Sequence, residues 1–160
     1  MYNQLEKSLG EVMKWKKNYG RKNVKPLGDK SCYSTSFGMV KTFEHGNHGT
    51  PGLYPASNNT LHPQVYAQLQ ELATLLKLEV TSFCVNKNLQ CRPHIDKLNV
   101  GDSTIVGLGD YEGGELIVEG KYIDIHYKPY CFNGAEKKHA TAPFQGTRYS
   151  IIFYTQKGKK

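Results

Sequence analysis

The sequence predicts an α+β domain, in which a β-sandwich or barrel core carries helices on one face. Two segments with helical spacing of apolar residues come first, and a series of short, strand-like runs follows them. Glycine-rich turns separate these runs, as is typical of antiparallel β structure. Because 160 residues is the length of one ordinary domain, we expect a single domain over residues 1–160.

The first half of the chain contains the predicted helices. We expect an amphipathic helix over residues 3–17, and with the basic loop that follows it this helix forms an N-terminal extension over residues 1–30. A strand over residues 34–43 precedes a second helix, which begins at Pro63, a residue suited to a first helical turn, and runs to about residue 78. Apolar side chains at helical spacing predict the two helices: Leu5, Leu9, Val12 and Met13 in the first, and Val65, Leu69, Leu72 and Leu76 in the second.

The second half of the chain has the sequence pattern of a β domain. Short β-branched or aromatic runs alternate with turn signals such as Gly113-Gly114 and Phe144–Gly146. We therefore expect residues 79–156 to form the β core. The predicted strands lie at residues 79–86, 103–107, 115–118, 122–127, 139–141 and 148–155.

Composition excludes several classes of protein. The chain has 38% hydrophobic residues and no apolar run near the ~18 residues that cross a bilayer, so we expect no membrane partner. The first residues also lack the apolar stretch of a signal peptide. Four cysteines without a Cys-x-x-Cys pair indicate reduced thiols, and hence an intracellular protein of the cytoplasm or nucleus. Nothing in the sequence indicates an obligate protein partner.

The net charge of +7 is unevenly distributed. Residues 12–28 contain six basic residues and no acidic one. Such a segment favours a polyanion, most commonly nucleic acid, although a solvated surface is the alternative. The expected phosphate contacts are Lys16, Lys17, Arg21, Lys22 and Lys25.

A candidate metal site begins at His94 and Asp96. Residues i and i+2 of a strand point to the same face, so an imidazole and a carboxylate can lie side by side. A non-haem iron site needs a third ligand on the same facial array and leaves the other positions open. His139 can supply that ligand. His126 competes with it, but its alternation with neighbouring isoleucines points its side chain outward, so we expect His126 to be structural.

The end of the chain predicts a hairpin that would complete the site. With Pro143–Gly146 as the loop, Thr141 pairs with Arg148 and His139 pairs with Ser150. This register puts the four side chains on one face and leaves His139 and Arg148 roughly 7–8 Å apart at the backbone. A dicarboxylate that chelates the metal at one end could then reach Arg148, whose planar fork donates two hydrogen bonds to a carboxylate, and Ser150 could add a hydroxyl hydrogen bond. The alternative for Arg148 is an ordinary salt bridge.

Residues Phe83 to Tyr154 resemble the 2-oxoglutarate- and iron(II)-dependent oxygenase superfamily. The resemblance rests on the His-x-Asp…His pattern and on a basic residue after the distal histidine. It implies a double-stranded β-helix (jelly-roll) core, with His94, Asp96 and His139 as ligands of Fe(II). It also implies that Arg148 and Ser150 hold 2-oxoglutarate and that O2 is the second cosubstrate.

A narrower resemblance is to the TET/JBP group of nucleic-acid base hydroxylases, especially its compact viral or phage, algal and fungal members. AlkB-type demethylases usually carry a second arginine six residues after the first, where this chain has Tyr154, and many prolyl hydroxylases use lysine in place of Arg148. The stretches that carry the resemblance are residues 85–88, 94–99, 105–116, 132–134 and 143–150.

The resemblance also suggests substrate contacts. Asn99 would lie near the target base, with a plain turn residue as the alternative. Asn86 would contact 2-oxoglutarate or the base, or else cap a strand end. The loop over residues 44–59 is long enough to be functional, with His45 and Asn47 as candidate contacts and a disordered connection as the alternative.

These observations lead to three hypotheses. The first is a dioxygenase that oxidises a methyl group on a nucleic-acid base, with 5-methylcytosine in DNA converted to 5-hydroxymethylcytosine or beyond. The second is a peptidyl, for example prolyl, hydroxylase of the same superfamily. The third is a non-catalytic nucleic-acid-binding module, which has no need of an intact ligand set.

Overall fold

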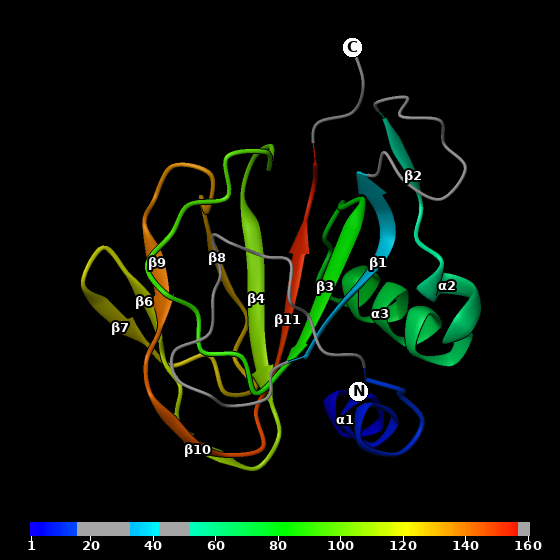
Figure 1. Cartoon of the computed structure of the whole chain (residues 1–160), viewed down its shortest axis with the longest axis horizontal. Helices are drawn as coiled ribbons and strands as arrows, with labels where there is room; N and C mark the ends of the chain where they lie inside the picture. Colours follow the sequence, from blue (N-terminus) through cyan, green and yellow to red (C-terminus); the bar gives the residue numbers. More distant parts are fainter. Residues whose placement is uncertain (16–32, 42–51, 157–160) are drawn as a thin grey trace.

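The structure, a computed structural model, describes residues 1–15, 33–41 and 52–156. Figure 1 shows a β core with its helices gathered on one side. The helices are α1 (Tyr2–Glu11), the short α2 (Asn58–Leu61) and α3 (Pro63–Leu75). Within the described residues, no helix is long and apolar enough to span a membrane.

The larger layer of the core is a six-stranded antiparallel sheet in the order β2-β1-β3-β11-β4-β8. Strand β11, the last strand among the described residues, therefore lies in the middle of the sheet, between β3 and β4. The six strands are β1 (Tyr33–Lys41), β2 (Leu53–Pro55), β3 (Ser82–Lys87), β4 (Ser103–Leu108), β8 (Tyr130–Phe132) and β11 (Tyr149–Tyr154).

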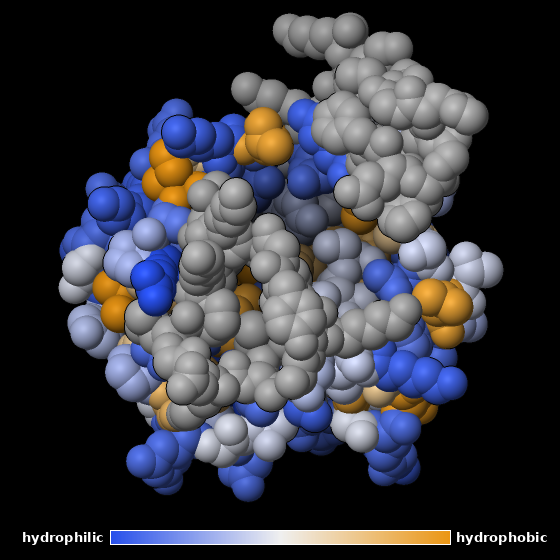
Figure 2. Space-filling model, viewed as in Figure 1, coloured by the Kyte–Doolittle hydropathy of each residue, from blue (hydrophilic) through white to orange (hydrophobic). Residues whose placement is uncertain are grey.

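Two smaller antiparallel sheets complete the core, with the orders β7-β6-β9 and β10-β5. Figure 1 places β6, β7 and β9 on the side of β4 that lies away from the helices. The surface over these strands is mostly hydrophilic, with few scattered apolar side chains (Figure 2). The strands are β5 (Tyr111–Gly113), β6 (Leu116–Val118), β7 (Lys121–Ile123), β9 (His139–Thr141) and β10 (Phe144–Gly146).

Strand alternation divides the core into two parts. On β11, Ile151 and Phe153 point to the helices, whereas Ser150 and Ile152 point to the opposite face. The helix face is closed by α1 and α3 in one apolar cluster that also includes Phe37, Phe83 and Val106. The opposite face has a smaller apolar cluster and room for polar side chains beside it. A functional site therefore has its place on the face away from the helices.

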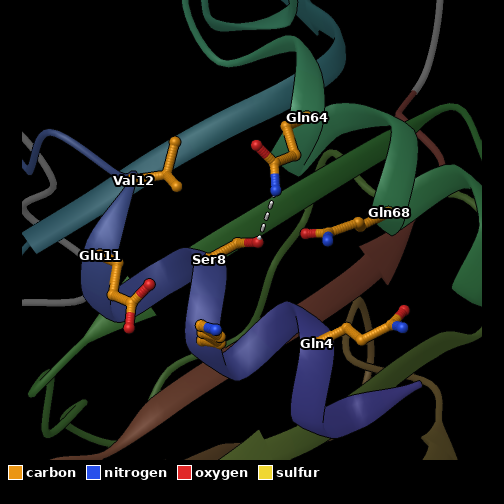
Figure 3. A pocket seen from close by; sticks show the side chains of 7 residues that line it. Gln4, Ser8, Glu11, Val12, Gln64 and Gln68 are labelled. Carbon is orange, nitrogen blue, oxygen red and sulfur yellow. Dashed lines mark hydrogen bonds between the residues drawn. The ribbon is translucent and has the colours of Figure 1, made fainter.

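Helix α1 packs on the same face of the core as α3, as the predicted fold class with helices on one face expects. Leu5 and Leu9 are completely buried. The helix packs beside α3, where Gln64 donates a hydrogen bond to the Ser8 hydroxyl across a polar groove (Figure 3). Burial of the two leucines makes α1 a structural part of the domain.

The predicted fold class is confirmed, and several predicted boundaries are corrected. Helix α1 ends at Glu11 instead of residue 17, because two successive amides, of Val12 and Met13, both donate to the Ser8 carbonyl and close the last turn. Residues 144–146, which were expected to form a turn, are strand β10. The β core also begins before residue 79, since β1 and β2 belong to the larger sheet.

Candidate metal centre

His94, Asp96 and His139 converge on one point, as the sequence predicts. One ligand atom from each residue lies within 4.8 Å of the other two. The Nε2 atom of His94 is 3.7 Å from Asp96 Oδ1, and that of His139 is 3.3 Å from Asp96 Oδ2. Two imidazole nitrogens and one carboxylate form the donor set that non-haem iron(II) oxygenases use. The set fits a divalent iron ion.

Both histidines are held so that Nε2 faces the centre. His94 Nδ1 lies 2.6 Å from the carbonyl oxygen of Arg92, and His139 Nδ1 lies 2.9 Å from that of Lys137. A carbonyl oxygen only accepts, so each Nδ1 carries the proton and each Nε2 presents its lone pair. The backbone thereby sets the tautomer that metal binding requires.

The local structure around His94 and Asp96 differs from the predicted strand. The backbone of His94 pairs with that of His139 in an isolated antiparallel bridge. The Asp96 amide donates to the Gly134 carbonyl at 2.8 Å. In Figure 1 this segment is the green connection between β3 and β4. These two ligands are fixed by backbone hydrogen bonds to residues 134–139, the segment that leads into β9. They do not lie in a regular strand.

Arg148 lines a cavity together with His94, Asp96 and His139. Its side chain is 2% exposed, and its Nε and one terminal nitrogen donate to the Gly114 carbonyl at 3.2 and 3.0 Å. The guanidinium lies over the rings of Tyr111 and Phe144 at 5.6 and 5.7 Å. No carboxylate among residues 1–15, 33–41 and 52–156 forms an ion pair with it. Desolvation by burial lowers the pKa of Arg148, so an anion in the cavity would relieve this cost.

Gly114 permits this placement of the arginine. Its φ of +68° is in the left-handed region, and a Cβ there would lie 2.7 Å from Arg148 Nε. Gly113-Gly114 was predicted only as a turn, and its role against the arginine was missed. The signal in the sequence that could have revealed this role is the glycine pair itself, which comes just before a strand that lines the site.

The hairpin that was predicted to bring His139 and Arg148 together is wrong. Strand β9 pairs with β6, and β11 pairs with β3 and β4. The residues between them do not form a tight loop, because Phe144–Gly146 pairs with β5 and carries the chain from one sheet to the other. His139, in β9 of the smaller sheet, and Arg148, directly before β11 of the larger sheet, therefore face one cavity.

The cavity contains all three candidate metal ligands and the three predicted cosubstrate residues. Asn86 is buried in the middle of the sheet, opposite Ser150 in the β3–β11 register, and donates to the Ser150 hydroxyl at 3.2 Å. It lines the cavity and does not cap a strand end. The lining residues that the sequence did not reveal include Cys91, Ile105, Leu116, Phe132 and Thr141.

Other predicted contacts are not brought into the cavity. Asn99 closes a turn with Asp96, its amide group is 3.5 Å from the Ser103 hydroxyl, and it does not line the cavity. His126 is structural, as expected: its Nε2 lies 2.7 Å from the Gly109 carbonyl oxygen. Outside the described residues lie His45, Asn47, Lys16, Lys17, Arg21, Lys22 and Lys25.

Comparison with known proteins adds to this geometry. The sequence matches no protein-family model and no curated protein. Among solved structures, an oxidoreductase of the 2OG-Fe(II) oxygenase family from Burkholderia pseudomallei has a TM-score of 0.52 and 14% identity, over 96% of this chain and 90% of that one. OsALKBH1 has a TM-score of 0.56 and 11% identity, over 97% and 91%.

This chain has the fold of the 2-oxoglutarate- and iron(II)-dependent oxygenases. A third structure with the oxygenase fold is NgTET1 in complex with 5mC DNA, with a TM-score of 0.57 and 18% identity over 79% of this chain. The present chain spans 62% of the length of that NgTET1 chain.

Proposed function

We propose that this protein is an Fe(II)- and 2-oxoglutarate-dependent dioxygenase that oxidises a methyl group on a nucleic-acid base, with 5-methylcytosine in DNA as the substrate. One observation carries the proposal. The His94, Asp96 and His139 donor set and the buried Arg148, without a carboxylate partner among the described residues, line the same cavity. A metal-chelating dicarboxylate is the ligand that both features require.

The residues that line the cavity would have separate roles in binding. His94, Asp96 and His139 would hold the iron, and Arg148 would neutralise the far carboxylate of 2-oxoglutarate in a buried setting. The Ser150 hydroxyl, which accepts from Asn86, retains its own proton for a carboxylate oxygen. When bound, iron and 2-oxoglutarate supply the oxidising chemistry with O2.

The site is recessed, and this restricts how a base reaches it. The two histidine side chains are 8% exposed, and that of Asp96 is 27% exposed. A base in a stacked duplex cannot approach such a centre, so the target nucleotide would have to be unpaired or flipped out. The likeness to NgTET1, solved with 5mC DNA, and the net charge of +7 support a nucleic-acid substrate.

The test is a substrate panel with purified protein, Fe(II), ascorbate and 2-oxoglutarate. Succinate release and nucleoside mass spectrometry would compare methylated DNA, unmethylated DNA, methylated RNA and a proline-containing peptide. We expect methylated DNA to stimulate succinate release and to yield 5-hydroxymethylcytosine. The His94→Ala variant, with its fold checked by circular dichroism, should give neither product. Stimulation by the peptide alone would assign the site to a peptidyl hydroxylase.

A further inference from the structure

We propose that Arg92 and Lys137 form a phosphate-binding rim that grips the nucleic-acid strand on both sides of the target nucleotide. This inference rests on the proposed function, because it assumes that a nucleotide enters the cavity. It places phosphate contacts on the segments that carry the metal ligands, in addition to those expected from the basic N-terminal segment.

The position of both residues is fixed by the metal site itself. Each precedes a ligand histidine by two residues, and each offers its backbone carbonyl to the Nδ1 atom of that histidine, at 2.6 Å for Arg92 and 2.9 Å for Lys137. Their side chains are exposed. The backbone of each cationic residue is therefore hydrogen-bonded directly to a metal-binding ring, and its side chain is accessible to solvent.

The two cations lie on opposite sides of the histidine pair. His94 and His139 pair in an antiparallel bridge, so the residue that precedes one histidine lies beside the residue that follows the other. Two further bonds show this arrangement: the Thr141 amide donates to the Cys91 carbonyl, and the Asp96 amide donates to the Gly134 carbonyl. A strand that crosses the site would meet one cation before the target nucleotide and the other after it.

The charge of the rim favours an anionic partner. The segments 92–97 and 136–138 together carry four exposed basic residues and one exposed acid, Glu136, besides the partly exposed ligand Asp96. The other two bases, Lys97 and Lys138, are each adjacent in sequence to a metal ligand. Exposed guanidinium and ammonium groups on both sides of the site can contact the phosphates of one strand, whereas the recessed centre would admit only the base.

The experiment measures binding, so it does not depend on turnover. Fluorescence anisotropy would follow a labelled single-stranded oligonucleotide with one 5-methylcytosine over a range of salt concentrations. The test variant carries Arg92→Gln and Lys137→Gln together. The control is Lys7→Gln, which removes an exposed lysine from α1 on the helix face. Iron affinity should be unchanged in all variants, because the carbonyls that hold the histidines belong to the backbone.

We expect the slope of log K against log salt to become shallower by about 1.4 in the double variant, at about 0.7 per lost phosphate contact on a single strand. Lys7→Gln should keep the wild-type slope. A wild-type slope in the double variant would overturn the rim, whether or not the protein oxidises the base. Failure of the wild type to oxidise any base would count against the proposed function instead. Tighter binding of an oligoglutamate, lost in the same double variant, would assign the rim to an acidic polypeptide.

Discussion

The backbones of His94 and His139 hold each other through a reciprocal pair of hydrogen bonds, from His94 N–H to the His139 carbonyl at 3.0 Å and back at 2.9 Å. The two rings lie 4.3 Å apart between centroids, with Asp96 beside both. Two ligands that are 45 residues apart in the chain are thereby fixed before a metal arrives. A preorganised donor set loses less conformational freedom on binding than a flexible one.

Loss of one ligand should abolish tight metal binding. We expect His94→Ala to lower the affinity for Fe(II) at least about 100-fold, since loss of even an outer-shell partner typically costs 10–100-fold. His126→Asn is the matched control, because His126 contacts Gly109 and lies outside the donor set. Anaerobic calorimetric titration measures both affinities. Equal loss in the two variants would show that the effect is general destabilisation.

Arg148 should determine whether 2-oxoglutarate stabilises the fold. At a concentration 100 times its Kd, a ligand stabilises the folded state by about 2.7 kcal/mol, which is a shift of several degrees in Tm. We expect this shift in the wild type with a redox-inert divalent metal bound, and no shift in Arg148→Met, which keeps an apolar stem but has no charge. Differential scanning fluorimetry with and without 2-oxoglutarate makes the comparison. An undiminished shift in the variant would place the cosubstrate carboxylate elsewhere.

Gly114→Ala should separate backbone strain from displacement of the arginine. Gly114 and Gly120 both have φ in the left-handed region, at +68° and +84°, but only at Gly114 would a Cβ approach Arg148. Each alanine variant should lose about 1–2 kcal/mol of stability from strain. Only Gly114→Ala should also weaken 2-oxoglutarate binding, by about tenfold or more. Urea unfolding and ligand titration measure the two effects, and equal cosubstrate affinity in the two variants would contradict the assigned role of Gly114.

Tyr127 should titrate late in the folded protein. Burial, together with the hydrogen bond from its hydroxyl to the Glu6 carboxylate, raises the pKa of Tyr127 to about 12. Because the unfolded value is about 10, this contribution to stability is complete below pH 10 and disappears as the pH rises to about 12. Tyr127→Phe should therefore show a shallower loss of stability over that interval.

The check for Tyr127 is a phenolate absorbance titration of the folded protein. The difference between wild type and Tyr127→Phe isolates one phenol, which is needed because burial also raises the pKa of Tyr2, Tyr111 and Tyr149. In Glu6→Gln the phenol of Tyr127 should titrate closer to pH 10. A difference spectrum already centred near pH 10 in the wild type would contradict the contact with α1.

The metal ligands could be predicted from the sequence, but the way they are brought together could not. The His-x-Asp pattern is recognisable in the sequence itself, and Arg148 lies directly before the strand that carries Ser150. The predicted hairpin assumed that neighbouring strands in the sequence pair, as they usually do. In this fold the pairing is non-local: β9 pairs with β6, and strand β10 crosses to β5. The local secondary-structure propensities of the residues do not encode which strands pair in this way.

The packing of α1 on one face of the core was predicted, but its polar contact was not. The helical spacing of Leu5 and Leu9 predicted the face of the helix that is buried. Its contact with the sheet depends on Glu6, which accepts a hydrogen bond from the Gly109 amide 103 residues later. The Gly114 contact with Arg148 was missed for the same reason, since both depend on loops packed together by the complete fold.

The central position of β11 sets the order in which the protein can mature. During synthesis, β3 and β4 emerge before residues 149–154, although these residues form the strand that lies between them. Such long-range pairing is slow to form and leaves two strand edges open in the meantime. A chain stopped before Tyr149 would contain all three metal ligands and would still lack the strand that supports them. We therefore expect the metal site to form only once β11 has paired with β3 and β4.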